Sequence, residues 1–69
     1  MQGYGKRLKD LRCDLTQTQV ANAIGVAPSA IAMYESEQRV PRDEIKIALA
    51  KFYHTTVEFI FFTNEGHDT

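Results

Sequence analysis

Side chains that could act as nucleophiles, general bases or metal ligands are few and scattered in this sequence. Cys13 is the single cysteine, and the two histidines, His54 and His67, belong to no spacing that is typical of zinc sites or general-base catalysis. No glycine-rich phosphate loop and no Ser/His/Asp set accompanies them. We therefore expect no enzyme, no metal and no cofactor, and an ordinary thiol at Cys13 rather than a redox switch.

The chemistry that the sequence favours is non-covalent, and it centres on one long segment without charge. Residues 15–34 contain no Asp, Glu, Lys or Arg, although these make up 25% of the chain. The net charge of −1 argues mildly against nucleic acid, because phosphates are bound mainly by Lys and Arg. The acids cluster elsewhere, however, so a mixed total can hide a basic face. The cations flanking the segment are Lys6, Arg7, Lys9, Arg12, Arg39 and Arg42.

Local signals divide the sequence into five short helices within one domain, residues 1–69. Thr16 followed by Gln19 has the form of a capping box, and Gly25 is suited to end the helix that this box begins. Pro28 fits the first turn of the next helix, and Thr56 can cap the last one. The helix beginning near residue 43 is apolar nearly all round, which predicts a central position. The predicted helices cover residues 4 to 11 or 12, 17–24, 27 or 28 to 36, 43–52 and about 57–61, before a polar tail at 63–69.

The segment at about residues 17–36 carries small and apolar residues at a distinctive spacing. Counted from Gln17, the fifth position, where two helices cross closely, is Ala21, and the ninth, where the chain turns, is Gly25. Five further positions are apolar. Such spacing predicts two helices joined by a tight turn, the helix-turn-helix pattern in which the second helix is offered to a DNA groove. The apolar residues are Val20, Ile24, Val26, Ile31 and Tyr34.

With these residues in register, the sequence resembles the Cro and cI repressors of phages and the small bacterial regulators related to them, the XRE family. The resemblance covers about residues 6–62 and includes Leu-Thr-Gln at 15–17, Ala-Ile-Gly-Val at 23–26 and Arg-Val-Pro at 39–41. It implies an all-α, lambda-repressor-like fold and a sequence-specific DNA-binding transcriptional regulator, most simply a repressor. Small helical domains that bind no DNA can share the apolar spacing alone.

Carried across by position, the resemblance implies which residues contact double-stranded DNA. The start of the first motif helix is expected to meet phosphates and the second helix to meet bases. Glu35 is expected to be a structural hydrogen-bond acceptor rather than a DNA contact. The implied DNA-binding residues are Thr16 and Gln17 at phosphates, Pro28, Ser29, Ala32 and Met33 at bases with Ala27 and Ala30 beside them, and Gln38, Arg39 and Arg42 on the flank.

The sequence departs from the family pattern in two places. The base-reading positions carry one hydroxyl, Ser29, among small and apolar groups, so no bidentate pair to guanine or adenine, worth about 1–3 kcal/mol of discrimination, can come from them. We expect alanines and Met33 to contact thymine methyls, and DNA shape to contribute, which favours A·T-rich half-sites. Only Cys13 and Asp14 separate Arg12 from the next motif, so the first helix is expected to be shorter or differently angled.

Four consecutive bulky residues near the end of the sequence predict self-association. They cannot all face inward from one helix, and a core of 69 residues is marginal without further buried surface. A homodimer would place two recognition helices about 34 Å apart on an inverted-repeat operator. A monomer with an apolar last turn is the alternative. The predicted interface residues are Val57, Phe59, Ile60, Phe61 and Phe62.

Location and further partners follow from the same reasoning. The N-terminus lacks the apolar run of a signal peptide and no stretch is long enough to span a membrane, so a soluble cytoplasmic protein without membrane contact is expected. RNA polymerase and an antirepressor are partners that a repressor would allow. The rival function is a protein-interaction module that keeps the helix-turn-helix fold without binding DNA. The near-neutral charge and the weakly polar recognition positions favour it.

Overall fold

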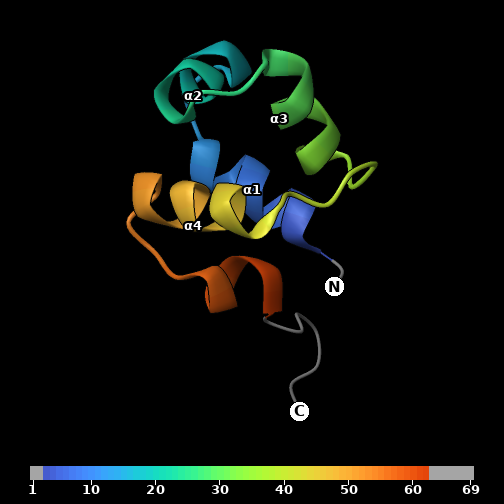
Figure 1. The fold of residues 1–69 in the computed structure, drawn as a ribbon, viewed down its shortest axis with the longest axis vertical. Helices are drawn as coiled ribbons and strands as arrows, with labels where there is room; N and C mark the ends of the chain where they lie inside the picture. Colours follow the sequence, from blue (N-terminus) through green and yellow to red (C-terminus); the bar gives the residue numbers. More distant parts are fainter. Residues whose placement is uncertain (1–2, 63–69) are drawn as a thin grey trace.

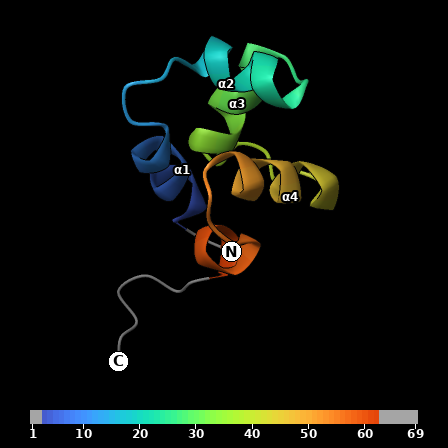
Figure 2. The ribbon, with the colours of Figure 1, turned by 90° about the vertical axis from the view of Figure 1, so that its left-hand side faces the viewer.

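The computed structural model describes residues 3–62, and this part of the chain contains helices and no strand. The two helices α2 and α3 lie at one end of the molecule and η1 lies at the other, with α1 and α4 between them (Figures 1 and 2). This arrangement confirms the predicted all-α class and five-helix architecture. The predicted polar tail at 63–69 lies outside the described residues. The elements are α1 (Tyr4–Arg12), α2 (Gln17–Ile24), α3 (Pro28–Glu35), α4 (Asp43–Phe52) and η1 (Glu58–Phe62), the last a π-helical turn.

The ends of α2 follow from local hydrogen bonds that the sequence signals predict. Thr16 Oγ1 accepts from the backbone N–H of Gln19 at 3.0 Å, and Gln19 Oε1 accepts from the N–H of Thr16 at 2.8 Å, which completes a capping box. Gly25 ends the helix in the left-handed conformation, with φ of +81°. Because Pro28 begins α3 directly afterwards, the two helices are joined by a tight turn.

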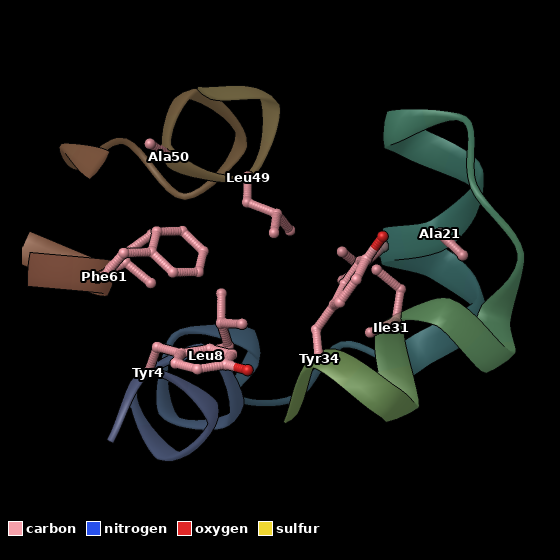
Figure 3. Close-up of a cluster of buried hydrophobic side chains, with 10 residues drawn as sticks. Tyr4, Leu8, Ala21, Ile31, Tyr34, Leu49, Ala50 and Phe61 are labelled. Atoms are coloured by element: carbon pink, nitrogen blue, oxygen red, sulfur yellow. The ribbon is translucent and has the colours of Figure 1, made fainter. Parts of the chain in front are cut away.

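A single core brings together side chains from all five elements. Figure 3 shows Leu8 of α1, Leu49 of α4 and Phe61 of η1 converging on one side of the core, while Ile31 and Tyr34 face Ala21 of α2 on the other. Tyr4 lies beside Leu8, and its ring centroid is 5.5 Å from that of Phe61. The residues buried in this core are Tyr4, Leu8, Val20, Ala21, Ile31, Tyr34, Leu49, Ala50, Ile60 and Phe61.

The helix α4 is less enclosed than its composition predicts. Ile47 is 47% exposed, whereas the neighbouring Lys46 is buried. The ammonium of Lys46 lies 5.5 Å from the ring centroid of Phe61 and 5.4 Å from that of Phe62. The alkyl stem of a lysine can cover apolar surface while its charge meets the aromatic faces, so Lys46 packs against η1 although it is charged.

Despite the short connection to α2, α1 has the bounds that the sequence predicts, and a helix shorter or differently angled than in the family stays a prediction. The helix continues through Arg12, and the chain reverses at Cys13, whose φ is +54°. The backbone N–H of Leu15 then donates to the carbonyl of Arg12 at 2.9 Å. One residue in an uncommon backbone conformation therefore replaces a longer loop.

Candidate nucleic-acid interface

The α2–α3 unit presents the first turn of α3 to the exterior. Ala21 is fully buried where the helices cross, and its carbonyl accepts from the backbone N–H of both Gly25 and Val26, at 2.8 and 3.0 Å. The turn is thereby fixed to the end of α2. At the start of α3, Ala27, Pro28 and Ser29 are exposed, and Ala32 and Met33 one turn later are partly exposed. The four implied base-reading positions, Pro28, Ser29, Ala32 and Met33, are therefore accessible from outside, as is Ala27 beside them.

No exposed side chain on α2 or α3 carries a charge. The one acid within these helices, Glu35, has a side chain that is only 3% exposed. Beside α3, the segment 36–42 carries Gln38, Arg39 and Arg42 on the surface. Among the described residues, neither arginine side chain has a hydrogen bond or ion pair, so both are available to an anionic partner.

Glu35 joins three helices through its carboxylate. Arg12 at the end of α1 donates from Nε to Oε2 at 2.6 Å and from Nη2 to Oε1 at 3.0 Å. Gln17 at the start of α2 donates from Nε2 to Oε1 at 3.1 Å. The hydrogen bonding of Arg12 to the carboxylate of Glu35 raises the pKa of Arg12 despite the opposing effect of burial. The prediction that Glu35 is a structural acceptor is confirmed, and its partners, distant in sequence, were not foreseen.

The same junction changes the interpretation of Arg12 and Gln17. Arg12 Nη1 also donates to the carbonyl of Leu15 at 2.7 Å, so its guanidinium is committed within the fold. Gln17 lies at the N-terminus of α2, with one amide N–H directed to Glu35. A phosphate contact from Gln17 stays a prediction, to be made by its remaining N–H. Thr16 is exposed and its oxygen serves as the cap of α2.

The structure corrects the set of flanking cations. Arg7 is 7% exposed, and its Nε donates to the carbonyl of Ile60 at 2.7 Å, because η1 docks over this part of α1. Arg7 therefore belongs to the core rather than to a basic face. Lys6 is exposed but paired with Asp10 at 3.3 Å. Of the flanking cations in the described residues, Arg39 and Arg42 are exposed on the segment that follows α3, and Lys9 is exposed on α1.

The structure also corrects the predicted self-association surface. Ile60 and Phe61 are fully buried against the core and cannot contact a second chain in this fold. Phe59 and Phe62 are 47% and 60% exposed, and Val57 is partly buried. The expectation that at least one residue of this run faces outward is confirmed. Figures 1 and 2 place η1 at the end of the molecule away from α2 and α3.

The described residues offer little for other chemistry. Within residues 3–62, no group of three or more His, Cys, Asp or Glu side chains is placed to hold a metal ion. The helices of this part are also too short and too polar for any of them to cross a membrane.

Two helices joined by a turn at Gly25, the second with an exposed and uncharged first turn, define the helix-turn-helix class. The helix-turn-helix family model matches residues 7–60, and the chain belongs to this family. It is 34% identical over 67 residues to an uncharacterized HTH-type transcriptional regulator, YobD of Bacillus subtilis (strain 168), a match that covers 94% of this chain and 60% of the relative. It is 40% identical over 52 residues to the cryptic phage CTXphi transcriptional repressor RstR of Vibrio cholerae, covering 72% of this chain and 47% of the relative.

The chain spans about half the length of these relatives, 60% of one and 47% of the other. No solved structure matches it.

Proposed function

We propose that this chain is a sequence-specific DNA-binding domain of a transcriptional regulator, most simply a repressor that blocks access to a promoter. The observation that carries the proposal is the exposed first turn of α3, free of charge, with the unpaired Arg39 and Arg42 beside it. A helix so presented fits the major groove, while flanking cations neutralise phosphates. The names of the relatives, a transcriptional regulator and a phage repressor, support the same function.

In this proposal, binding energy and sequence preference come from different residues. Arg39 and Arg42 would contact phosphates on one side of α3, and the N-terminus of α2 with Thr16 and Gln17 would contact them on the other. These contacts set the register of the domain on the duplex but carry no sequence information.

Base recognition would rest on small groups that allow the α3 backbone to approach the groove floor. Met33 and the alanines 27 and 32 suit thymine methyl groups, and the Ser29 hydroxyl can reach a base edge. With no bidentate donor on α3, preference is expected to be modest and biased towards A·T-rich half-sites, with DNA shape contributing.

A homodimer would complete the binding unit through Phe59 and Phe62. Both rings are exposed on η1, and the Lys46 ammonium, 5.4 Å from the Phe62 ring centroid, helps to fix the direction of that ring. An interface there would leave α3 uncovered, since the two lie at opposite ends of the molecule (Figure 1). Two copies related by a two-fold axis would then require an inverted-repeat operator.

The decisive experiment measures binding to a random-sequence duplex and to DNA from near the coding region of this protein, over a series of salt concentrations. Phosphate binding predicts that affinity falls steeply with salt, and Arg39→Ala should reduce the slope of log K against log salt by about 1. Lys51→Ala is the matched control, because this exposed cation lies at the opposite end of α4 from Arg42. A flat response in the wild type would contradict DNA binding.

Sequence preference is tested separately. The double variant Ser29→Ala, Met33→Ala should reduce the ratio of specific to random-sequence affinity more than it reduces random-sequence affinity itself. A selected operator dominated by invariant G·C pairs under α3 would contradict the proposed mode of recognition.

The rival candidate is a protein-interaction module that uses the same surface. The absence of charge from the exposed side chains of α3 and the net charge of −1 favour it, since a surface without charged groups suits an apolar partner. The salt series distinguishes the two functions, because only phosphate binding releases counterions in proportion to the number of contacts.

A further inference from the structure

The segment that carries Arg39 begins with backbone hydrogen bonds to α3, from Glu37 N–H to the carbonyl of Tyr34 at 3.2 Å and from Gln38 N–H to the carbonyl of Met33 at 2.9 Å. Residues 36–42 join α3 to α4, and a hollow of about 330 Å³ lies between this segment and the two helices. Val40 is 53% exposed at its edge, whereas Pro41 is buried. The lining of the hollow includes Val26, Ala30, Tyr34, Arg39, Val40 and Ile45. Contacts from α1 add to the hydrogen bonds that join the start of the segment to α3.

Two hydrogen bonds from α1 supply such contacts. Tyr4 Oη donates to the backbone carbonyl of Arg39 at 3.1 Å, and the backbone N–H of Gly5 donates to Glu37 Oε2 at 3.0 Å. The N-cap of α1 is Gly3, which has no side chain that could accept from the first N–H groups of the helix. The carboxylate of Glu37, distant in sequence, caps the helix instead.

The structure around Tyr4 and the backbone of Glu37 both restrict how these two residues can move. Tyr4 is 2% exposed and its ring packs beside Phe61, with the hydroxyl pointing away from Phe61 (Figure 3). Burial, and then the nearby charge of Glu37, raises the pKa of Tyr4, so the phenol stays protonated as a donor. Glu37 itself has a φ of +62°, an uncommon conformation that the surrounding contacts must maintain.

We propose that Tyr4 and Glu37 are positioning residues that hold the 36–42 segment in the conformation in which Arg39 binds DNA. This inference rests on the proposed function. The Arg39 backbone is tied to the core while its side chain is left free for a phosphate, so less conformational freedom is lost on binding. Neither Tyr4 nor Glu37 touches DNA in this arrangement.

A double-mutant cycle with Tyr4→Phe and Arg39→Ala tests the proposal on a random-sequence duplex at low salt. Tyr4→Phe removes one hydroxyl and keeps the buried ring. In the wild-type background it should weaken binding by about 2- to 12-fold, the range expected for ordering one long side chain. In the Arg39→Ala background it should have no further effect on Kd. The free energy of unfolding should show no such coupling, because the Arg39 side chain has no hydrogen bond or ion pair within residues 3–62.

A second comparison isolates the other anchor. Glu37→Gln keeps an oxygen acceptor for the Gly5 N–H, whereas Glu37→Ala removes it, and both variants retain a Cβ at the same positive φ and lose the same charge. The glutamine variant should therefore bind DNA more tightly than the alanine variant.

Equal losses from Tyr4→Phe in both backgrounds, or equal affinities of the two Glu37 variants, would overturn the positioning role while leaving DNA binding intact. A wild-type protein whose binding does not depend on salt would instead overturn the proposed function, and this inference with it.

Discussion

The carboxylate of Glu35 is the residue-scale feature that most constrains the DNA-binding unit. It is almost fully buried and receives three side-chain hydrogen bonds, two of them from Arg12. A buried carboxylate needs such donors, because an unpaired charge in the interior is strongly destabilising. Glu35 thus ties the end of α1 to the start of α2.

Arg12→Lys tests this junction by keeping the charge and removing the fork of donors. Hydrogen bonds to charged groups contribute about 1.5–3 kcal/mol, so the free energy of unfolding should fall by about that amount. Lys6→Ala, which breaks the exposed pair with Asp10, is the control and should cost no more than about 0.5 kcal/mol. Chemical denaturation measures both, and equal effects would contradict the assigned role of Arg12.

The raised pKa of Tyr53 leads us to expect that the free energy of unfolding depends on pH in the alkaline range. Burial, followed by the charge of Glu35, raises the pKa of Tyr53 to about 12 from an ordinary value of 10.0. The unfolded chain releases this proton first, so the stabilisation is complete below about pH 10 and is lost as the pH rises towards 12. Tyr53→Phe keeps the ring beside Phe52 and should show a shallower decline in unfolding free energy across this window. An identical decline in both proteins would contradict the prediction.

At the scale of elements, Gly5 and Gly25 are needed for different reasons, the first because space is lacking and the second because of its backbone conformation. A Cβ built on Gly5 would lie 2.2 Å from the carbonyl oxygen of Glu35, so α1 and the end of α3 approach too closely for any side chain. A Cβ on Gly25 meets nothing within 4 Å, but the φ there is +81°. Both are required, for different reasons.

Gly5→Ala should therefore destabilise the fold by about 1–3 kcal/mol or more through overpacking, and no small side chain should restore it. Gly25→Ala should cost about 1–2 kcal/mol, and Gly25→Asn should recover part of the loss, since asparagine tolerates the left-handed region. Thermal unfolding of these three variants and of Gly5→Asn distinguishes the two causes. Recovery by asparagine at position 5 as well would contradict the crowding argument.

The elements that the sequence predicted well are those with local signals. The bounds of α2 follow from the capping box and Gly25, which act within a few residues. The burial of Arg7 and Lys46 could not be predicted, because it depends on how η1 docks on α1 and α4. The same holds for two contacts between distant residues. Arg12 and Glu35 are 23 positions apart in sequence, and Tyr4 and Arg39 are 35 positions apart. The sequence thus predicted surface positions for DNA binding that are accessible in the structure, but it did not predict the hydrogen bonds that hold the surrounding elements in place.

At the scale of the whole molecule, the proposed dimer depends on rings that project from η1. Phe62→Ser should shift the protein towards monomer and weaken operator binding while changing unfolding little, since the ring is 60% exposed. Leu15→Ser is the matched control, because this apolar side chain is exposed on the α1–α2 connection. Sedimentation analysis of the three proteins measures the shift. A wild-type monomer at all concentrations would contradict the dimer.

The docking of η1 against α1 also governs when this chain can fold during synthesis. The hydrogen bond from Arg7 to Ile60 closes a separation of 53 residues, and Tyr4 stacks near Phe61. A ribosome-bound chain that ends before residue 60 exposes Leu8 and Tyr4 without their covering partner. The side of the core that Tyr4 and Leu8 line therefore closes only after residues 60 and 61 have been made, and a chain that ends before them should fold less stably than one that contains η1.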